Sequence, residues 1–151
     1  MVSGGRAPYS DLMSVLRTLL CALFFAATAV TPLHADAPAQ DFEKVIEGQI
    51  SAFARDDGRA AFAFASPDIQ QQFGTAERFM EMVRAGFQPV YRPRSFSFEA
   101  PIRIDGAPAQ PVRIIDRDGR GVIALYRMQR QEDGSWRIAG VTLHPIAERG
   151  I

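Results

Sequence analysis

The chain has 151 residues, and its 17 basic and 17 acidic residues give a net charge of zero at pH 7. That balance, with no long block of one sign, argues against nucleic-acid binding, which needs a basic surface. The one cysteine, Cys21, lies in an apolar run near the N-terminus. The rest of the sequence therefore has no thiol, no disulfide and no cysteine-based metal site.

The N-terminal region has the pattern of a signal peptide. Residues 18–30 form an uninterrupted weakly polar to apolar run directly after Arg17. The run has the length of a secretory apolar region and is shorter than the roughly 20 residues that a membrane span needs. We expect residues 1–35 to be a signal peptide cleaved after Ala35, with an uncleaved anchor as the alternative.

The start codon and the mature chain follow from that assignment. Met13 opens a more conventional signal sequence than Met1, so either can be the true start. The mature chain, residues 36–151, has the length of one domain and can bury a core of its own. We expect it to be periplasmic or secreted, with no membrane contact after cleavage.

The first part of the mature chain reads as a long amphipathic helix. Asp41 can cap its N-terminus, and apolar residues then recur at spacings of three and four. We expect the helix to end near residues 56–58, with Gly58 in the left-handed conformation. One apolar stripe of this helix should face a core.

Two further helices are expected before the strands. Residues 59–65 are alanine and phenylalanine after Arg59, and they read as a short helix buried nearly all round. Residues 68–73 read as a helical turn. Thr75 can cap the third helix, which residues 88–89, Gln-Pro, should end.

The apolar period then changes to two, as in strands half buried on one face. The first strand covers residues 96–104, with Pro101 placing it at an edge or a bulge. Residues 105–106, Asp-Gly, turn the chain into a second strand around Val112, and residues 117–119 form the next turn. A four-strand antiparallel meander is the expected sheet.

The clearest structural signal is the hairpin in residues 121–143, for which two registers compete. A two-residue Asp-Gly turn would place Trp136 opposite Gln131 and mix apolar with polar residues on one face. A three-residue loop closed by Gly134 in the left-handed region places Trp136 and Ile138 on the face of Tyr126. We choose the second register, because it alone segregates the two faces.

The order of helices and strands, together with four motifs, resembles the exported bacterial family catalogued as domain of unknown function 4864. The motifs are Phe62-Ala63-Phe64-Ala65-Ser66-Pro67, Gln72-Phe73-Gly74, Phe87-Gln88-Pro89-Val90-Tyr91-Arg92-Pro93 and Asp133-Gly134-Ser135-Trp136-Arg137-Ile138-Ala139-Gly140-Val141. That family is similar to the cone-shaped fold of nuclear transport factor 2, the SnoaL-type cyclases and ketosteroid isomerase. The resemblance implies an α+β domain over residues 36–151, with three N-terminal helices packed on a curved four-strand antiparallel meander.

The resemblance does not carry catalytic residues over to this chain. The ketosteroid isomerase branch implies a Tyr and two acids inside the cone, and the candidates here do not fall at matching positions: Tyr91, Tyr126, Glu99 and Asp116. The SnoaL branch implies a His and Asp pair, but residues 36–151 contain one histidine, His144, which we expect at the surface. We predict no catalytic residues, no metal and no cofactor.

Charged clusters in this sequence have structural explanations as well as functional ones. The acidic pairs 56–57 and 116/118 adjoin glycines, where Asp favours turns through bonds to the backbone. Arg92-Pro93-Arg94 can bind a ligand carboxylate or phosphate, or it can be solvated or paired with Glu99.

The many phenylalanines indicate either an apolar cavity or a filled core. We predict a non-catalytic domain that binds a small apolar ligand or a protein partner. Its guessed lining is Phe53, Phe79, Tyr91, Arg92, Phe96, Tyr126 and Trp136.

Two alternative functions remain open at this stage. The first is an enzyme of the isomerase, dehydratase or hydrolase kind, which requires a buried carboxylate or tyrosine with a shifted pKa. The second is a dimeric structural protein that pairs through the outer face of the sheet, where Leu125, Ala139 and Val141 are expected.

Overall fold

A computed structural model of the chain describes residues 37–146. The predicted signal peptide, its cleavage after Ala35 and the choice between Met1 and Met13 lie outside these residues. Among the residues described, no helix is both long enough and apolar enough to cross a membrane.

The predicted α+β order, helices first and then an antiparallel sheet, is confirmed. The described helices are α2 (Ala37–Ala54), α3 (Gly58–Ala63), α4 (Pro67–Phe73), α5 (Ala76–Gly86) and α6 (Gln88–Tyr91). The described strands are β1 (Ser95–Phe98), β2 (Ile102–Ile104), β3 (Ala107–Ile115), β4 (Gly121–Arg130) and β5 (Trp136–Pro145). Both layers thus contain more elements than the periodicity predicted.

The sheet has the order β1-β3-β4-β5, with β2 also paired to β3, and every ladder is antiparallel. The strand expected over residues 96–104 is therefore two strands, interrupted at residues 99–101 beside Pro101. Asp105 and Gly106 both have positive φ, 50° and 80°, as a two-residue type I′ turn requires.

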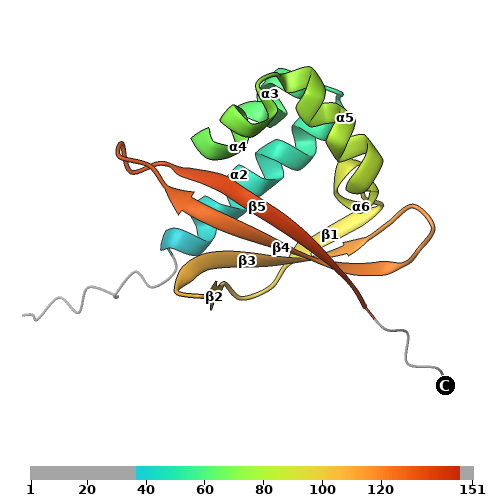
Figure 1. The fold of residues 1–151 in the computed structure, drawn as a ribbon. Helices are drawn as coiled ribbons and strands as arrows, with labels where there is room; N and C mark the ends of the chain where they lie inside the picture. The colour runs from blue at the N-terminus through green and yellow to red at the C-terminus, as the bar shows by residue number, and fades with distance from the viewer. Residues whose placement is uncertain (1–36, 147–151) are drawn as a thin grey trace, which may run out of the picture. The chain divides into compact units, whose positions relative to one another are not determined.

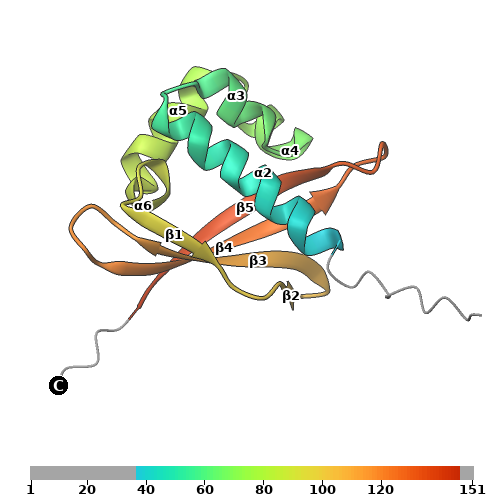
Figure 2. The same ribbon diagram turned by 180° about the vertical axis from the view of Figure 1, so that it is seen from behind.

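All the described helices cover one face of the sheet. In Figures 1 and 2, α2 runs diagonally across that face. Helices α3, α4 and α5 lie on the same side of the sheet as α2. Helix α2 contacts β3 and β5 of the sheet and also α3 and α6 of the helical layer. It makes the most extensive contact of any described helix with the sheet, and α4 and α6 add smaller ones.

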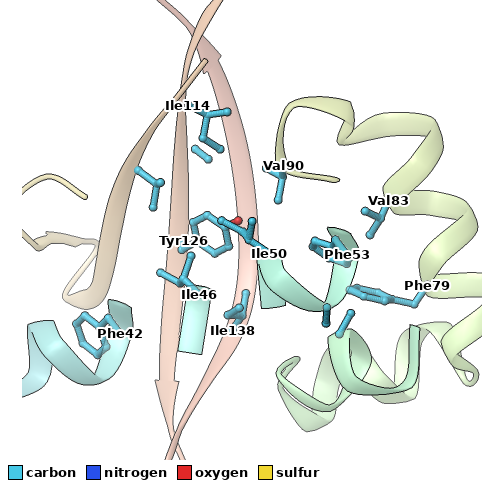
Figure 3. Close-up of a cluster of buried hydrophobic side chains, with 14 of the residues drawn as sticks. Phe42, Ile46, Ile50, Phe53, Phe79, Val83, Val90, Ile114, Tyr126 and Ile138 are labelled. Atoms are coloured by element: carbon cyan, nitrogen blue, oxygen red, sulfur yellow. The ribbon is translucent and has the colours of Figure 1, made fainter. Parts of the chain in front are cut away.

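The apolar stripe predicted for α2 forms the centre of the core. Phe42, Ile46, Ile50 and Phe53 recur along one side of the helix and are at most 4% exposed. They pack with buried side chains of β3, β4 and β5, including Tyr126 (Figure 3). Each such side chain contributes about 1.5–3 kcal/mol on burial, so this contact outweighs any single polar interaction in the domain.

The predicted hairpin register is confirmed. Gly134 has a φ of 83° and closes a three-residue loop, with Met128 opposite Ile138 and Arg130 opposite Trp136. Trp136 then meets the ring of Phe42 edge-on, with the ring centroids 4.8 Å apart. The tip of the hairpin is thereby attached to the N-terminal half of α2.

A β-bulge that the sequence pattern did not predict interrupts β5. Met128 pairs with Ile138 but Arg127 pairs with Gly140, so Ala139 is an extra residue. Beyond the bulge Val141 lies opposite Tyr126 and packs against the core. The expectation that Val141 belongs to the outer face is therefore wrong, because the bulge shifts the alternation of β5 by one residue.

The turn between α2 and α3 also differs from expectation. The left-handed residue is Asp56, with a φ of 55°, whereas Gly58 is the first residue of α3. Glycine at position 58 permits close packing, since a Cβ there would lie 2.8 Å from Met80 Cγ and the Met80 side chain would have to shift. Asp57 caps α3 by accepting a hydrogen bond from the backbone N–H of Ala60.

The remaining helix signals are partly confirmed. Thr75 caps α5 through a hydrogen bond from the N–H of Arg78, as predicted. Helix α3 is not buried all round, because Ala63 is exposed. Residues 88–89 begin α6 instead of ending the helical region, since proline suits the first turn of a helix.

The hydroxyl of Tyr126 gives a test of the core. Tyr126 is fully buried, and its Oη has no hydrogen-bond partner within residues 37–146. We expect Tyr126→Phe to raise the free energy of unfolding by about 1 kcal/mol, because a buried unpaired hydroxyl is removed. Urea denaturation measures this change.

Tyr91→Phe is the matched control for that substitution. The Tyr91 hydroxyl donates a hydrogen bond to Asp56, so its removal should lower stability. A loss of stability in Tyr126→Phe comparable to that in Tyr91→Phe would contradict the packing described for Tyr126.

Candidate functional site

An apolar pocket of about 350 Å³ lies between α2, α4, α5 and β5. Ligand sites in proteins commonly have volumes of about 300–1,000 Å³, so a small molecule fits. The residues that line it are Gln49, Phe53, Ala65, Ile69, Gln72, Phe73, Phe79, Met82, Val83, Phe87, Val90, Ile138, Gly140 and Val141.

Backbone bonds to the edge strand β5 fix the position of α4 above the sheet. The N–H of Ile138 donates to the carbonyl of Phe64 (2.9 Å), and the N–H of Ser66 donates to the carbonyl of Ile138 (2.8 Å). Ala65 thereby forms an isolated parallel bridge with Ile138. Ser66 then caps α4, so this helix begins directly beside the strand.

Helices α4 and α5 supply the outer wall of the pocket. Ile69 and Phe73 are one turn apart on α4 and face the same way. Phe79 of α5 lies among three other aromatic rings, with centroid distances of 5.2 Å to Phe62, 5.7 Å to Phe73 and 6.2 Å to Phe53. These ring contacts stiffen the wall without closing the pocket.

Two glutamines are the only polar side chains among the described residues of the lining. Gln49 is 3% exposed and donates a hydrogen bond to the carbonyl of Ala61 (3.2 Å). Gln72 is exposed and lies on α4. No lining residue described here titrates, so the pocket provides hydrogen bonds but no general acid or base.

The structure brings together two of the guessed lining residues, Phe53 and Phe79, in this pocket. Arg92 and Phe96 line a different depression, which also contacts α2. Tyr91 lies on α6 and forms a polar cluster described below.

The other two guessed residues, Tyr126 and Trp136, lie within the packed layers and do not line the pocket. Burial raises the pKa of the Tyr126 phenol, since nothing near it compensates the charged form. The indole of Trp136 is covered by Phe42 and by the guanidinium of Arg130, 6.0 Å from its ring centroid. Both residues therefore act in packing.

Four polar residues form a cluster that we call the Asp56 cluster: Asp56, Arg84, Tyr91 and Arg92. They come from the α2–α3 turn, α5 and the C-terminal end of α6. Asp56 accepts hydrogen bonds from the Tyr91 hydroxyl and from the guanidinium of Arg92, and Arg84 Nη2 lies 3.3 Å from its Oδ1. Both guanidinium groups also lie over the Tyr91 ring, at 5.7 Å and 5.0 Å. The cluster ties the α2–α3 turn to α5 and α6.

This environment stabilises the charged form of Asp56. The hydrogen bond from Tyr91 is the main cause that lowers the pKa of the Asp56 carboxyl, and Arg84 and Arg92 add to the effect. The carboxylate remains 43% exposed, so water screens these interactions. Asp56 is therefore a structural anion rather than a proton donor.

The other acidic turn residues act as predicted. Asp116 Oδ1 accepts backbone hydrogen bonds from Asp118 (2.9 Å) and Arg120 (2.8 Å). His144 is exposed, and its Nε2 lies 3.1 Å from the hydroxyl of Thr142. Across residues 37–146, no three acidic, histidine or cysteine side chains gather in a way that could hold a metal ion.

Sequence reasoning missed most of the pocket, although part of its signal was present. Ile69 and Phe73 stand at helical spacing in the segment that was expected to form only a turn. Gly140 and Val141 reach the pocket because of the bulge in β5, and the sequence pattern gave no indication of that irregularity. Asp56 has the sequence context of a turn former, and its partners lie 28 to 36 residues further along the chain.

Comparison with known proteins identifies the family. Residues 35–151 match the family model described as domain of unknown function (DUF4864). The chain belongs to this family. No curated protein and no solved structure matches the chain. The pocket and the Asp56 cluster both lie within the matched part of the DUF4864 domain.

The Asp56 cluster gives a prediction on pH dependence. Asp56→Asn should lower the melting temperature slightly at pH 7, because it removes the charge while asparagine still tolerates the left-handed backbone. The pKa of folded Asp56 lies below its ordinary value of 3.8, so the stabilisation is present above that pH. It is lost as the pH falls through the folded pKa. Thermal unfolding from pH 2 to pH 7 measures the difference between the two proteins.

Asp57→Asn is the matched control, since asparagine caps a helix as well as aspartate does. It should change the melting temperature little at any pH. An equal effect of both substitutions, or a larger effect of Asp56→Asn in acid than at neutral pH, would contradict the role of the cluster.

Proposed function

We propose that this DUF4864 protein is a non-catalytic binding domain that holds a small apolar molecule in the pocket between α2, α4, α5 and β5. The observation that carries the proposal is a cavity of about 350 Å³ whose lining is apolar except for two glutamines. Larger side chains in the lining would fill this space and add dispersion contacts. The space lies next to a tightly packed core, so the protein gives up that stabilisation where a ligand could bind.

The chemistry of the lining limits the kind of ligand. A ring or a branched chain can pack against Phe53, Val83 and Ile138 in the interior. The exposed Gln72 offers an amide at the wall formed by α4, so a ligand with one hydroxyl or carbonyl group at its outer end suits the site. A charged group inside the pocket would lack a counter-ion, so we expect a neutral molecule.

Binding is favoured over catalysis by the same lining. An enzyme of the isomerase or hydrolase kind needs a group that transfers a proton within reach of the substrate. Tyr126 has a raised pKa but is 0% exposed and does not line the pocket. The enzyme alternative would require a rearrangement that exposes its hydroxyl.

The cellular context is part of the proposal. A signal peptide over residues 1–35 would deliver the domain to the periplasm or outside the cell. A cone-shaped fold like that of nuclear transport factor 2 and ketosteroid isomerase is a further part of the proposal, and helices followed by an antiparallel sheet are compatible with it.

A pair of substitutions at Met82, which lines the pocket and is half-buried, tests the proposal. The neutral fluorescent probe N-phenyl-1-naphthylamine should bind the wild type. Met82→Trp fills space and should weaken that binding at least about tenfold, a change of about 1.4 kcal/mol. Met82→Ala enlarges the space and should retain it. Fluorescence titration gives the affinities, and circular dichroism verifies the fold.

Native mass spectrometry of protein purified from its own host can then identify the natural ligand. We expect an added mass of a few hundred daltons that disappears in Met82→Trp. Equal probe affinity in both Met82 variants, or no binding by the wild type, would refute the proposed pocket function.

A further inference from the structure

A second depression, separate from the apolar pocket, lies where α2 meets the segment between α6 and β1. We call it the arginine groove; its volume is about 780 Å³. It shares no residue with the apolar pocket. Its lining is Glu47, Ile50, Ser51, Ala54, Arg92, Pro93, Arg94, Ser95, Phe96 and Arg117.

Sheet pairing brings three arginines together in this groove. Arg92 and Arg94 flank Pro93 just before β1, and the N–H of Arg94 donates to the carbonyl of Ile115 at the end of β3 (2.8 Å). Arg117 follows two residues later, in the exposed turn between β3 and β4. Arg92, Arg94 and Arg117 therefore line one surface, although Arg117 is distant from the other two in the sequence.

The positive charge of the groove is only partly neutralised. Arg92 donates a hydrogen bond from Nη2 to Asp56. The buried Nε of Arg92 has no acceptor within the described residues. Arg94 and Arg117 form no ion pair with any carboxylate of residues 37–146, and Glu99 is paired with Arg113 instead. Glu47 is the one acid in the lining. The groove thus keeps donors that are suited to an anion.

Neutral groups beside the arginines complete the site. Ser51 Oγ accepts a hydrogen bond from Arg55 Nη1 (2.6 Å), which leaves its own proton free to donate. Ile50, Pro93 and Phe96 provide apolar surface in the same groove. A bound molecule would therefore meet cations, a hydroxyl donor and an apolar wall together.

We propose that the arginine groove binds a small organic anion, a carboxylate or phosphate monoester that carries a ring or a short chain. Arg94 and Arg117 hold the anionic group, with Ser51 as a further donor. Phe96 and Pro93 contact the apolar part. This site is independent of the apolar pocket, which takes neutral molecules.

Calorimetric titration with phenyl phosphate at low ionic strength tests this proposal. We expect the wild type to bind with a dissociation constant in the millimolar range or below. The double variant Arg94→Gln/Arg117→Gln should bind at least tenfold more weakly. Inorganic phosphate should bind the wild type more weakly than phenyl phosphate does, because it lacks the ring that contacts Phe96.

The matched control is Arg78→Gln/Arg127→Gln, which removes two exposed arginines outside the groove. It should bind phenyl phosphate as the wild type does. Both double variants should keep the melting temperature of the wild type, since neither pair of side chains forms an ion pair within residues 37–146.

Three results would overturn the proposal. The first is equal phenyl phosphate binding by the groove variant and the wild type, and the second is equal binding of inorganic and phenyl phosphate. The third is binding of phosphatidylglycerol vesicles that depends on Arg94 and Arg117 while phenyl phosphate does not bind. That third result would assign the groove to a membrane surface instead of a free molecule.

Discussion

The packing of α2 on the sheet is the contact on which the rest of the structure depends. Ile46 and Ile50 of α2 are buried and lie beside the buried Tyr126 of β4 (Figure 3). This contact fixes which face of the sheet is internal, and the strand register follows because a slip of one residue would expose Tyr126. Helix α2 also fixes the position of the hairpin tip, since Trp136 packs on Phe42 near the N-terminal end of the helix.

The outer helices are positioned by polar anchors at two places, and the apolar pocket lies between them. Backbone bonds between the Ala65 segment and Ile138 fix α4 to the edge of the sheet. The Asp56 cluster holds the α2–α3 turn to α5 and α6. Both anchors set the separation of the helices from β5 without filling the space, so the pocket is a consequence of how the two layers are joined.

The sequence predicted features that depend on local chemistry and missed those that depend on distant contacts. Thr75 and Gly134 mark a helix cap and a turn because their own conformations require those residue types. The bulge at Ala139 leaves no such mark, because it is defined by how β5 pairs with β4 and not by the residue type at that position. Asp56 likewise looks like an ordinary turn residue, and only the fold brings Arg84 and Arg92 to it. The predicted lining residues are therefore divided among the pocket, the arginine groove, the Asp56 cluster and the core.

The central claim is that the helices and the sheet enclose an accessible apolar space beside Phe53 and Ile138. Xenon enters such spaces in protein crystals because it binds by dispersion alone. A crystal of residues 36–151 under xenon pressure tests the claim most directly. We predict a xenon atom in contact with Phe53, Val83 and Ile138. Side chains or ordered water filling that volume, with xenon absent from it, would contradict the account.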